Sequence, residues 1–229
     1  MSKLSSLTLA LTAYNEEEAV PQTAARAIRF LSDTAERWEL LIVDDGSTDG
    51  TVDILRTLTE SHANVRILTH ETNRGMGAAI RTAIEAAQSK WFCTIAADGQ
   101  VDPLDLTAFI EPALYYPAVF STYLNRRDGW DRTFLSNGLR LLMAITTGTW
   151  KIPTGNYFIQ TNILKSFHLR STSFFVNFEV FLETRRSRHP YVWVQIPCAA
   201  RPSGQSKIRN VRTILRVTRE LFRYRLGLP

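Results

Sequence analysis

Hydrophobic and polar residues follow two different periods along the first 124 residues. Short apolar runs typical of buried β-strands cover residues 7–13, 39–44, 65–69, 91–97 and 118–124. Between them, apolar residues recur at the spacing of amphipathic helices over residues 19–32, 51–61 and 78–88. Because alternating strands and helices form βαβ units, the pattern predicts an α/β fold with a mostly parallel sheet and helices on both faces.

The pattern becomes less regular after residue 125. It predicts a helix from residue 132 to about 147, an irregular segment at 152–157, a helix around 178–188, a strand at 191–197 and a basic C-terminal helix. No low-complexity stretch separates two units, so we expect residues 1–229 to form a single domain. Neither a leader pattern nor a run of about eighteen apolar residues occurs, so we expect no membrane-spanning segment.

The charge of the chain is unevenly distributed. Residues 1–129 contain 11 Lys+Arg and 18 Asp+Glu, a net charge of −7, whereas residues 130–229 contain 16 and 4, a net charge of +12. A basic half of this kind usually faces phosphate, either of a nucleic acid or of an anionic lipid. No recognised nucleic-acid-binding motif accompanies it, so nucleic acid is not an expected partner. Cys93 and Cys198 provide neither a disulfide framework nor a zinc cluster, which fits a reducing compartment.

Polar clusters follow four of the predicted strands at the point where each strand ends. They occupy residues 14–16, 44–47, 73–75 and 98–100. The carboxyl ends of parallel strands meet at one edge of a sheet, where ligands bind, so we expect these clusters to form one rim. Asp44 or Asp45 could accept hydrogen bonds from a nucleobase or from ribose hydroxyl groups. The alternative is that this segment forms only a turn and a helix cap.

The other two clusters suggest phosphate and metal chemistry. Residues 73–77 place an Asn, an Arg and two glycines before an alanine-rich helix, which suits close approach of the backbone to a ligand; a glycine-assisted helix start is the alternative. Asp98 and Gln100 follow a buried strand and could hold Mg²⁺ or Mn²⁺ that bridges a diphosphate. Asp98 and Gly99 are also an ordinary turn pair, with residues 102–103 starting the next helix.

Together, the segments TAYNEEE, VDDGSTDGT, NRGMG and ADGQVDP resemble family 2 glycosyltransferases of the GT-A fold, in particular the dolichol-phosphate mannose synthase branch and its bacterial polyprenyl-phosphate relatives. NRRDGWDRTFLSNGLR, PTGNYF and RPSGQSK in the second half are similar to the same branch. The resemblance implies a GT-A (Rossmann-like) domain with C-terminal amphipathic helices. It implies an inverting enzyme that moves a hexose from a nucleotide-diphosphate sugar, of the GDP-mannose or UDP-glucose type, to dolichyl or undecaprenyl phosphate. Residues 1–124 would bind the nucleotide sugar, and residues 125–229 would face the acceptor and the membrane.

The same resemblance assigns roles to individual residues. The residues expected to bind the donor are Ala13, Tyr14, Asn15, Glu16, Asp44, Asp45, Ser47, Asn73 and Gly75. The expected metal ligands are Asp98 and Gln100, and the expected catalytic set is Asp98, Arg127, Arg132 and Ser136. Arg127 and Arg132 of this set, together with Arg126, would bind the lipid phosphate. Arg201 and Lys207 would belong to a loop that closes over the phosphates.

One position departs from the family pattern. Members usually read Asp-x-Asp-x-Gln, whereas this chain has Ala96 at the first acidic position. We therefore expect Mg²⁺ or Mn²⁺ as cofactor, bound more weakly because one carboxylate is missing. The implied reaction is direct displacement by an acceptor phosphate that is already anionic near neutral pH, so no strong general base is required. The four histidines are accordingly expected to be structural or solvated. Glu179 is expected to be a polar position on an amphipathic helix, and the alternative is that it orients a sugar hydroxyl.

The predicted C-terminal helix carries a stripe of arginines at spacings of three and four, namely Arg209, Arg212, Arg216, Arg219 and Arg223. Such a helix can lie on an anionic leaflet, so the expected partners are a nucleotide sugar, a polyprenyl phosphate lipid and a membrane surface. We expect a peripheral protein of the cytoplasmic face of a membrane, with the oligomeric state open. The alternatives are a helix that only covers the core, a GT-A transferase for a soluble or polysaccharide acceptor, and a degenerate non-catalytic relative that binds nucleotide sugars.

Overall fold

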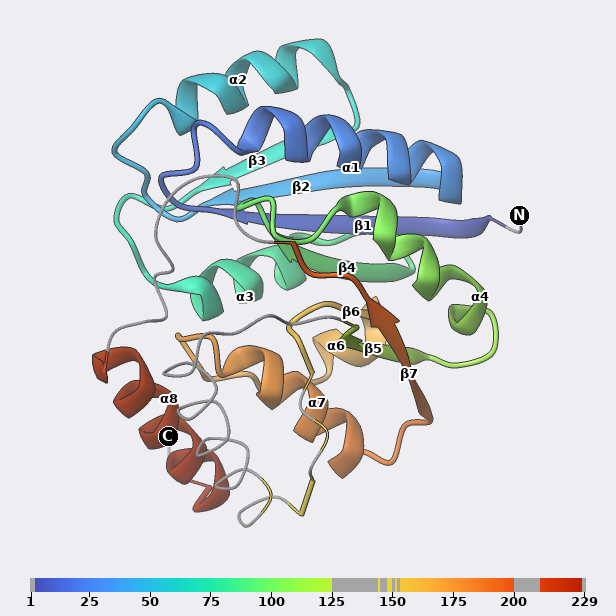
Figure 1. Ribbon diagram of the computed structural model, residues 1–229, viewed down its shortest axis with the longest axis vertical. Helices are drawn as coiled ribbons and strands as arrows, with labels where there is room; N and C mark the ends of the chain where they lie inside the picture. Colours follow the sequence, from blue (N-terminus) through green and yellow to red (C-terminus); the bar gives the residue numbers. More distant parts are fainter. Residues whose placement is uncertain are drawn as a thin grey trace.

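A seven-stranded sheet runs through the centre of the computed structural model, which describes residues 3–124, 144, 148–149, 151, 153–199 and 211–227. Within these residues the strand order is β3-β2-β1-β4-β6-β5-β7 (Figure 1). The strands are β1 Leu4–Ala13, β2 Ala35–Asp44, β3 Val65–Thr69, β4 Trp91–Ala96, β5 Ala118–Tyr123, β6 Tyr157–Gln160 and β7 Tyr191–Ile196. The helices are α1 Val20–Thr34, α2 Thr51–Ser61, α3 Met76–Ala86, the 3₁₀ helix η1 Pro103–Phe109, α4 Ile110–Ala113, α6 Thr161–Lys165, α7 Val176–Arg186 and α8 Val211–Arg225.

The strand pairing is mostly parallel, as the sequence predicts. β1 pairs in parallel with β2 and β4, β2 with β3, and β5 with β7, whereas β6 is antiparallel to β4 and β5. The prediction that residues 152–157 are irregular is wrong at its end, because Tyr157 begins β6. Tyr157, Phe158 and Ile159 are all fully buried. Because both faces of this short strand pack against other residues, it lacks the apolar–polar alternation that would have revealed it.

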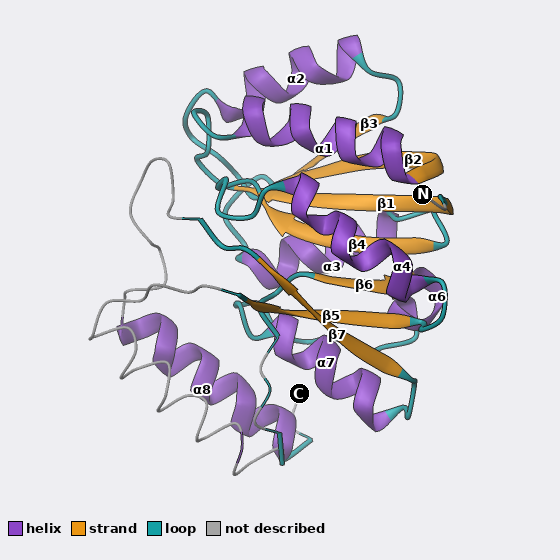
Figure 2. Cartoon of the chain, turned by 45° about the vertical axis from the view of Figure 1, so that its right-hand side comes forward, coloured by secondary structure: helices purple, strands orange, loops and turns teal. Residues whose placement is uncertain are grey.

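Helices cover both faces of the sheet, which confirms the predicted layers (Figures 1 and 2). One face packs against α1, α2 and η1 through residues such as Phe30 and Leu55. The opposite face packs against α3, α6, α7 and α8 through residues such as Ile80 and Leu221. No helix in the described part of the chain is both long and apolar enough to cross a membrane.

Element boundaries differ from the predicted ones where polar residues occur inside an element. The helix expected at 51–61 is confirmed as α2, and the one expected around 178–188 is α7, Val176–Arg186. β1 and β2, however, begin at Leu4 and Ala35, earlier than residues 7 and 39. The extra residues pair with each other, since Leu4 lies opposite Ala35. Glu36 and Arg37 are exposed at this end, and their polarity hides the start of β2.

Candidate functional site

The predicted polar clusters lie at one edge of the sheet. Ala13 at the end of β1 pairs with Asp44 on β2, and Thr12 pairs with Ala96 on β4. Asp44 is the last residue of β2, and Asp98 lies two residues beyond the end of β4, so both lie at the carboxyl ends of the two strands that flank β1. These strand ends are at the left of the sheet in Figure 1. The structure thus forms the single rim that the sequence predicts.

Side-chain hydrogen bonds join the loop after β1 to the loop after β2. Ser47 Oγ accepts the backbone N–H of Asn15 at 2.9 Å, and Asn15 Oδ1 accepts the backbone N–H of Thr48 at 2.8 Å. Thr51 Oγ1 accepts the N–H of Glu16 at 2.9 Å. Asn15 has a left-handed φ of 52°, which Asn tolerates better than most residues. Three of the predicted donor-binding residues therefore also hold two rim loops together.

Asp49 lies just before α2, and its side chain reaches the backbone of that helix. Its Oδ1 accepts the N–H of Thr51 at 3.1 Å, and its Oδ2 accepts the N–H of Glu17 at 3.3 Å. Burial raises the pKa of Asp49, but these hydrogen bonds outweigh it and the pKa lies below its ordinary value. The stabilisation is therefore present above the unfolded-state pKa and is lost as the pH falls through the lowered value.

Asp44 is a buried carboxylate with one unused oxygen. Its side chain is fully buried, and Oδ2 accepts the N–H of Ser47 at 3.2 Å. Oδ1 has no hydrogen-bond partner within the described structure. A buried carboxylate oxygen without a partner is unfavourable, and a hydrogen-bond donor on a ligand would satisfy it. Asp44 therefore has the acceptor capacity that recognition of a nucleoside requires.

Asp45, although adjacent, has both oxygens engaged by the chain itself. Oδ1 accepts the N–H of Arg74 at 2.9 Å and lies 2.7 Å from His70 Nδ1, while Oδ2 accepts the N–H of Gly75 at 2.8 Å. His70 is itself buried and lies 3.0 Å from Thr82 Oγ1 through Nε2. These contacts give Asp45 a positioning role, holding the loop after β3, and its contact with the donor stays a prediction.

The two glycines at the start of α3 approach the chain's own backbone. A Cβ on Gly75, whose φ is +91°, would overlap the carbonyl oxygen of Thr172, and a Cβ on Gly77 would overlap that of Ser171. Thr172 O also accepts the N–H of Gly77 at 3.1 Å. Of the two interpretations of residues 73–77, the structure favours the glycine-assisted helix start over close approach to a ligand. Gly75 packs against Thr172, and its contact with the donor stays a prediction.

We predict that Gly77→Ala destabilises the protein by about 1–3 kcal/mol, because the new methyl group must displace the backbone of residues 171–172. In an isolated helix the same change would stabilise by about 1 kcal/mol. Urea unfolding measures the difference. Gly50→Ala is the matched control, since a Cβ there meets only the flexible end of Glu17. Equal stability of the Gly77 variant and wild type would show that the segments do not pack this closely.

Asp98 lies in the turn that follows β4. Its side chain is 7% exposed, and its Oδ1 accepts the N–H of Gln100 at 3.1 Å across Gly99, whose φ is +69°. The described residues contain no group of three His, Cys, Asp or Glu side chains arranged to hold a metal. Mg²⁺ at phosphate-transfer sites is commonly held by one or two carboxylates plus substrate phosphates. The donor set of Asp98 and Gln100, with Ala96 beside it, fits only that mode, in which a diphosphate supplies the remaining oxygens.

Residues 8–184 match the family model described as glycosyl transferase family 2. The chain belongs to glycosyl transferase family 2. It is 29% identical over 150 residues to the undecaprenyl-phosphate 4-deoxy-4-formamido-L-arabinose transferase of Proteus mirabilis, covering 64% of this chain and 45% of that protein. It is 31% identical over 103 residues to the dolichyl-phosphate beta-glucosyltransferase of Dictyostelium discoideum, covering 42% and 32%. The family 2 chain thus spans less than half the length of these relatives.

Solved structures support the same fold. Glucosyl-3-phosphoglycerate synthase from Mycobacterium tuberculosis, in complex with Mn²⁺, uridine diphosphate and phosphoglyceric acid, superposes with a TM-score of 0.73. The superposition covers 98% of this chain and 80% of the synthase, at 21% identity. The predicted GT-A class is therefore confirmed for this family 2 glycosyltransferase.

Several predicted site residues lie outside the described part of the family 2 chain. These are Arg126, Arg127, Arg132, Ser136, Arg201 and Lys207, and the helix expected from residue 132 to about 147 lies largely in the same region. Their roles remain predictions. Among the other predicted donor residues, Tyr14 is half-buried in the loop after β1 and Asn73 is exposed in the loop after β3.

Glu179 differs from its predicted role as a polar position on an amphipathic helix. It is 2% exposed, and its carboxylate accepts the N–H groups of Arg170 and Ser171 at 2.9 and 3.0 Å. Glu179 therefore holds residues 170–171 in place, next to the backbone that packs against the first turn of α3. The sequence offers one signal for this role, an acidic residue within the apolar run FVNFEVF, but no indication of its partners.

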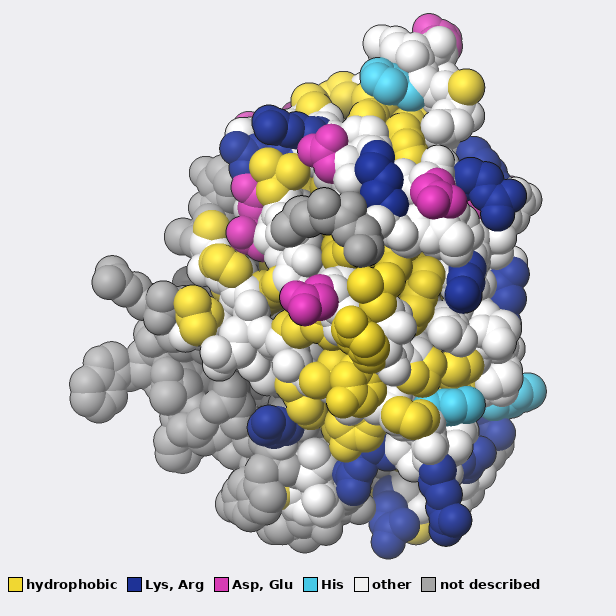
Figure 3. Space-filling view, turned by 90° about the vertical axis from the view of Figure 1, so that its right-hand side faces the viewer, with side chains coloured by type: hydrophobic (Ala, Val, Ile, Leu, Met, Phe, Trp, Pro, Cys, Tyr) yellow, Lys and Arg dark blue, Asp and Glu magenta, His cyan; other side chains and the backbone are white. Residues whose placement is uncertain are grey.

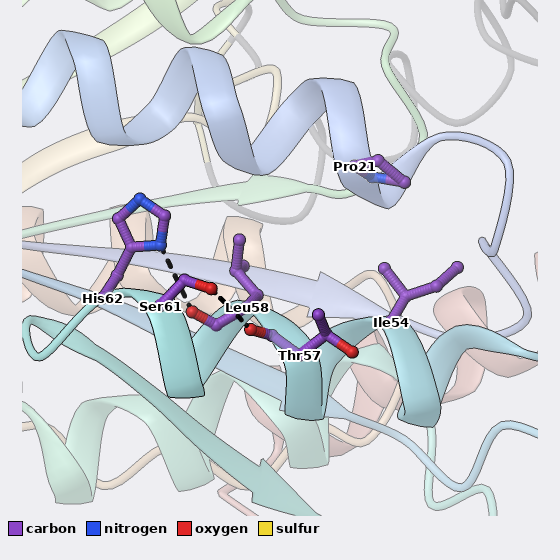
Figure 4. Close-up of a pocket in the computed structure, with 6 residues that line it drawn as sticks. All are labelled: Pro21, Ile54, Thr57, Leu58, Ser61 and His62. Carbon is purple, nitrogen blue, oxygen red and sulfur yellow. Dashed lines mark hydrogen bonds between the residues drawn. The ribbon is translucent and has the colours of Figure 1, made fainter.

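Two surface features lie apart from the rim. A hollow between α1 and α2 is lined by Pro21, Ile54, Thr57, Leu58, Ser61 and His62 (Figure 4). It contains no carboxylate and no lysine or arginine. Apolar side chains also gather on the side of the molecule shown in Figure 3. Leu114 and Tyr115, which follow α4, are exposed. That side lies at the amino ends of β1–β4, opposite the rim.

Proposed function

We propose that the chain is the catalytic domain of an inverting transferase that moves a hexose from a nucleotide-diphosphate sugar to a polyprenyl phosphate. The observation that carries this proposal is the rim, where the carboxylates of Asp44 and Asp98 lie at the carboxyl ends of the two strands that flank β1. Asp44 is buried, and its Oδ1 has no hydrogen-bond partner among the described residues. The relatives' names support the acceptor class, since they specify undecaprenyl, dolichyl or dodecaprenyl phosphate. A donor of the UDP-glucose or GDP-mannose type is consistent with the uridine diphosphate bound by the synthase of similar fold.

In this proposal the rim residues divide the work of binding. Asp44 Oδ1 accepts a hydrogen bond from an N–H or O–H group of the nucleoside. Asp98 and Gln100 hold Mg²⁺ or Mn²⁺, which supplies positive charge to the departing nucleotide diphosphate. Asp45 keeps the loop after β3 in place through its bonds to Arg74 and Gly75. The phosphate of the acceptor is assigned to the basic residues of the second half, Arg126, Arg127, Arg132, Arg201 and Lys207, with Ser136.

The proposed reaction is a single displacement. An acceptor phosphate oxygen attacks the anomeric carbon, the bond from that carbon to the diphosphate oxygen breaks, and the electron pair leaves with the nucleotide diphosphate. The configuration at carbon is therefore inverted. Because a phosphate monoester has a second pKa of about 6, the nucleophile is anionic near neutral pH and no side chain has to remove a proton.

Helix α8 supports a peripheral location at an anionic membrane surface, and we assign it to the cytoplasmic face because that leaflet carries the anionic lipids. Val217 and Leu221 are buried against the core, whereas Arg219 and Arg223 on the same helix are exposed. Phe222 is 47% exposed next to these arginines. Lysine and arginine side chains near an anionic leaflet contribute about 1 kcal/mol each. The helix can thus cover the core with one side and contact lipid headgroups with the other.

The test is a transfer assay with radiolabelled nucleotide sugars and polyprenyl phosphate in vesicles, with Mn²⁺ or Mg²⁺. We expect label in the organic phase for one donor, at a higher rate when the vesicles contain anionic lipid. Label that reaches only a soluble or polysaccharide acceptor would overturn the lipid acceptor.

Ala96 favours one other candidate, a non-catalytic binder of nucleotide sugars, because it removes a carboxylate ligand. That candidate predicts calorimetric binding of nucleoside diphosphate without transfer to any acceptor.

A further inference from the structure

Arg216 is an arginine of α8 whose side chain reaches toward the rim. Its Nη2 donates a hydrogen bond to Thr172 Oγ1 at 2.6 Å. Its Nη1 lies 4.0 Å from the position that a Cβ on Gly75 would occupy. By contrast, the side chains of Arg219, Arg223 and Arg225 make no hydrogen bond or ion pair with the residues that the structure describes. The stripe of arginines expected to face outward therefore has one member with a different environment.

A short series of contacts connects Arg216 to the donor side of the rim. Asp45, which follows Asp44 in the chain, accepts the N–H of Gly75 at 2.8 Å. Gly75 packs against Thr172, and Thr172 accepts the hydrogen bond from Arg216. The guanidinium group consequently lies beside the backbone that Asp45 fixes. In Figure 1 the N-terminal part of α8 lies on the same side of the molecule as the start of α3.

The guanidinium group retains hydrogen-bonding capacity in this position. A guanidinium has five N–H donors, and one of them is used by Thr172 at 2.6 Å. Its Nε is 3.8 Å from Glu220 Oε1, beyond hydrogen-bond distance, and the Arg216 side chain is 54% exposed. The Glu220 carboxylate accepts hydrogen bonds from the N–H of Thr172 and the hydroxyl of Ser173. Glu220 thus anchors the segment to α8 and forms an ion pair with Arg216, while part of the guanidinium fork has no hydrogen-bond partner among the described residues and can bind an oxyanion.

We propose that Arg216 binds a phosphate group of the reactants, so that α8 contributes a side chain to the site as well as covering the core. The proposal rests on the proposed function, because it takes the phosphate from the bound donor diphosphate or from the lipid acceptor. Both sources present the same oxygens to the guanidinium fork. Tight binding through two parallel N–H···O bonds requires arginine, and lysine would retain the charge without this geometry.

The experiment compares Arg216→Ala, Arg216→Lys and the control Arg225→Ala on the same helix. Calorimetry with uridine or guanosine diphosphate and Mn²⁺ reports on the donor, and the KM for polyprenyl phosphate in vesicles reports on the acceptor. We expect Arg216→Ala to weaken one of the two by about 10–100-fold, the range for a charged hydrogen bond, with Arg216→Lys intermediate and Arg225→Ala unchanged. A change in the calorimetric value assigns the donor diphosphate; a change in KM alone assigns the lipid phosphate.

A second variant separates phosphate binding from a purely structural role. Thr172→Val removes the hydroxyl that accepts the Arg216 bond and also lies 3.3 Å from Glu220 Oε1, but it retains the cation and the bond from the Thr172 N–H to Glu220. If Arg216 acts only by holding the segment 171–173, Thr172→Val will reproduce the full loss and the proposal is wrong. Unchanged nucleotide affinity and KM in Arg216→Ala would also overturn it. Wild-type protein that binds no nucleoside diphosphate and transfers no sugar would instead overturn the proposed function itself.

Discussion

Asp98→Asn is expected to reduce sugar transfer by at least about 100-fold while the protein remains folded. Asp98 supplies the carboxylate of the proposed metal site, and Ala96 leaves no second one in the usual position. Charge stabilisation of this kind contributes several kcal/mol to the transition state, and each 1.36 kcal/mol corresponds to about a factor of ten in rate. Asn retains an oxygen that can accept the N–H of Gln100, so the turn after β4 should persist. Initial rates at several Mn²⁺ concentrations, with thermal unfolding, measure both effects.

Two variants control this prediction. Asp53→Asn removes an exposed carboxylate on α2 and should leave the rate unchanged. Ala96→Asp restores the usual family residue and should lower the Mn²⁺ concentration needed for half-maximal activity, because a second carboxylate adds a ligand. Full activity in Asp98→Asn would remove the metal assignment, whereas a low rate in all variants and in wild type would support the non-catalytic alternative.

Asp44→Asn is expected to weaken nucleotide binding by about 10–100-fold without loss of stability. The unused Oδ1 of Asp44 is the proposed acceptor for the nucleoside, and an amide nitrogen at that position would donate instead of accept. In the protein without nucleotide, Asp44→Asn removes a buried charge whose Oδ1 has no hydrogen-bond partner among the described residues. We therefore expect an equal or higher melting temperature. Calorimetry with nucleoside diphosphate and a thermal melt give the two values from one preparation.

Asp45→Asn provides the contrast at the neighbouring position. An Asn side chain has one acceptor oxygen, whereas the Asp45 carboxylate accepts the N–H groups of Arg74 and Gly75 on different oxygens. At least one buried N–H would lose its partner, at a cost of about 1–3 kcal/mol. If Asp44→Asn lowered the melting temperature as much as Asp45→Asn, the distinction between a binding and a positioning carboxylate would fail.

The sequence was sufficient for the rim because the rule that locates it depends on strand direction alone. Once apolar runs and helical periods alternate, the sheet is largely parallel and the residues after its strands share one edge. β6 could not be predicted in this way, because Tyr157, Phe158 and Ile159 are buried on both faces and show no alternation. The buried position of Glu179 could not be predicted either. A carboxylate inside an apolar run is placed by its partners, and here these are the N–H groups of Arg170 and Ser171, which lie outside α7 and outside the helical spacing of three or four residues.

By itself, the sequence determined the α/β class, the single rim and the resemblance to family 2 glycosyltransferases. The tertiary structure alone decided how adjacent residues divide their roles. Asp44 and Asp45 are identical in type and consecutive in the chain, yet one has an unused oxygen and the other holds the loop after β3. The same holds for Gly75, which packs against Thr172, and for Arg216, which turns from the basic stripe toward the rim. Hydrogen-bond partners distant in sequence decide these roles, and local spacing carries no information about them.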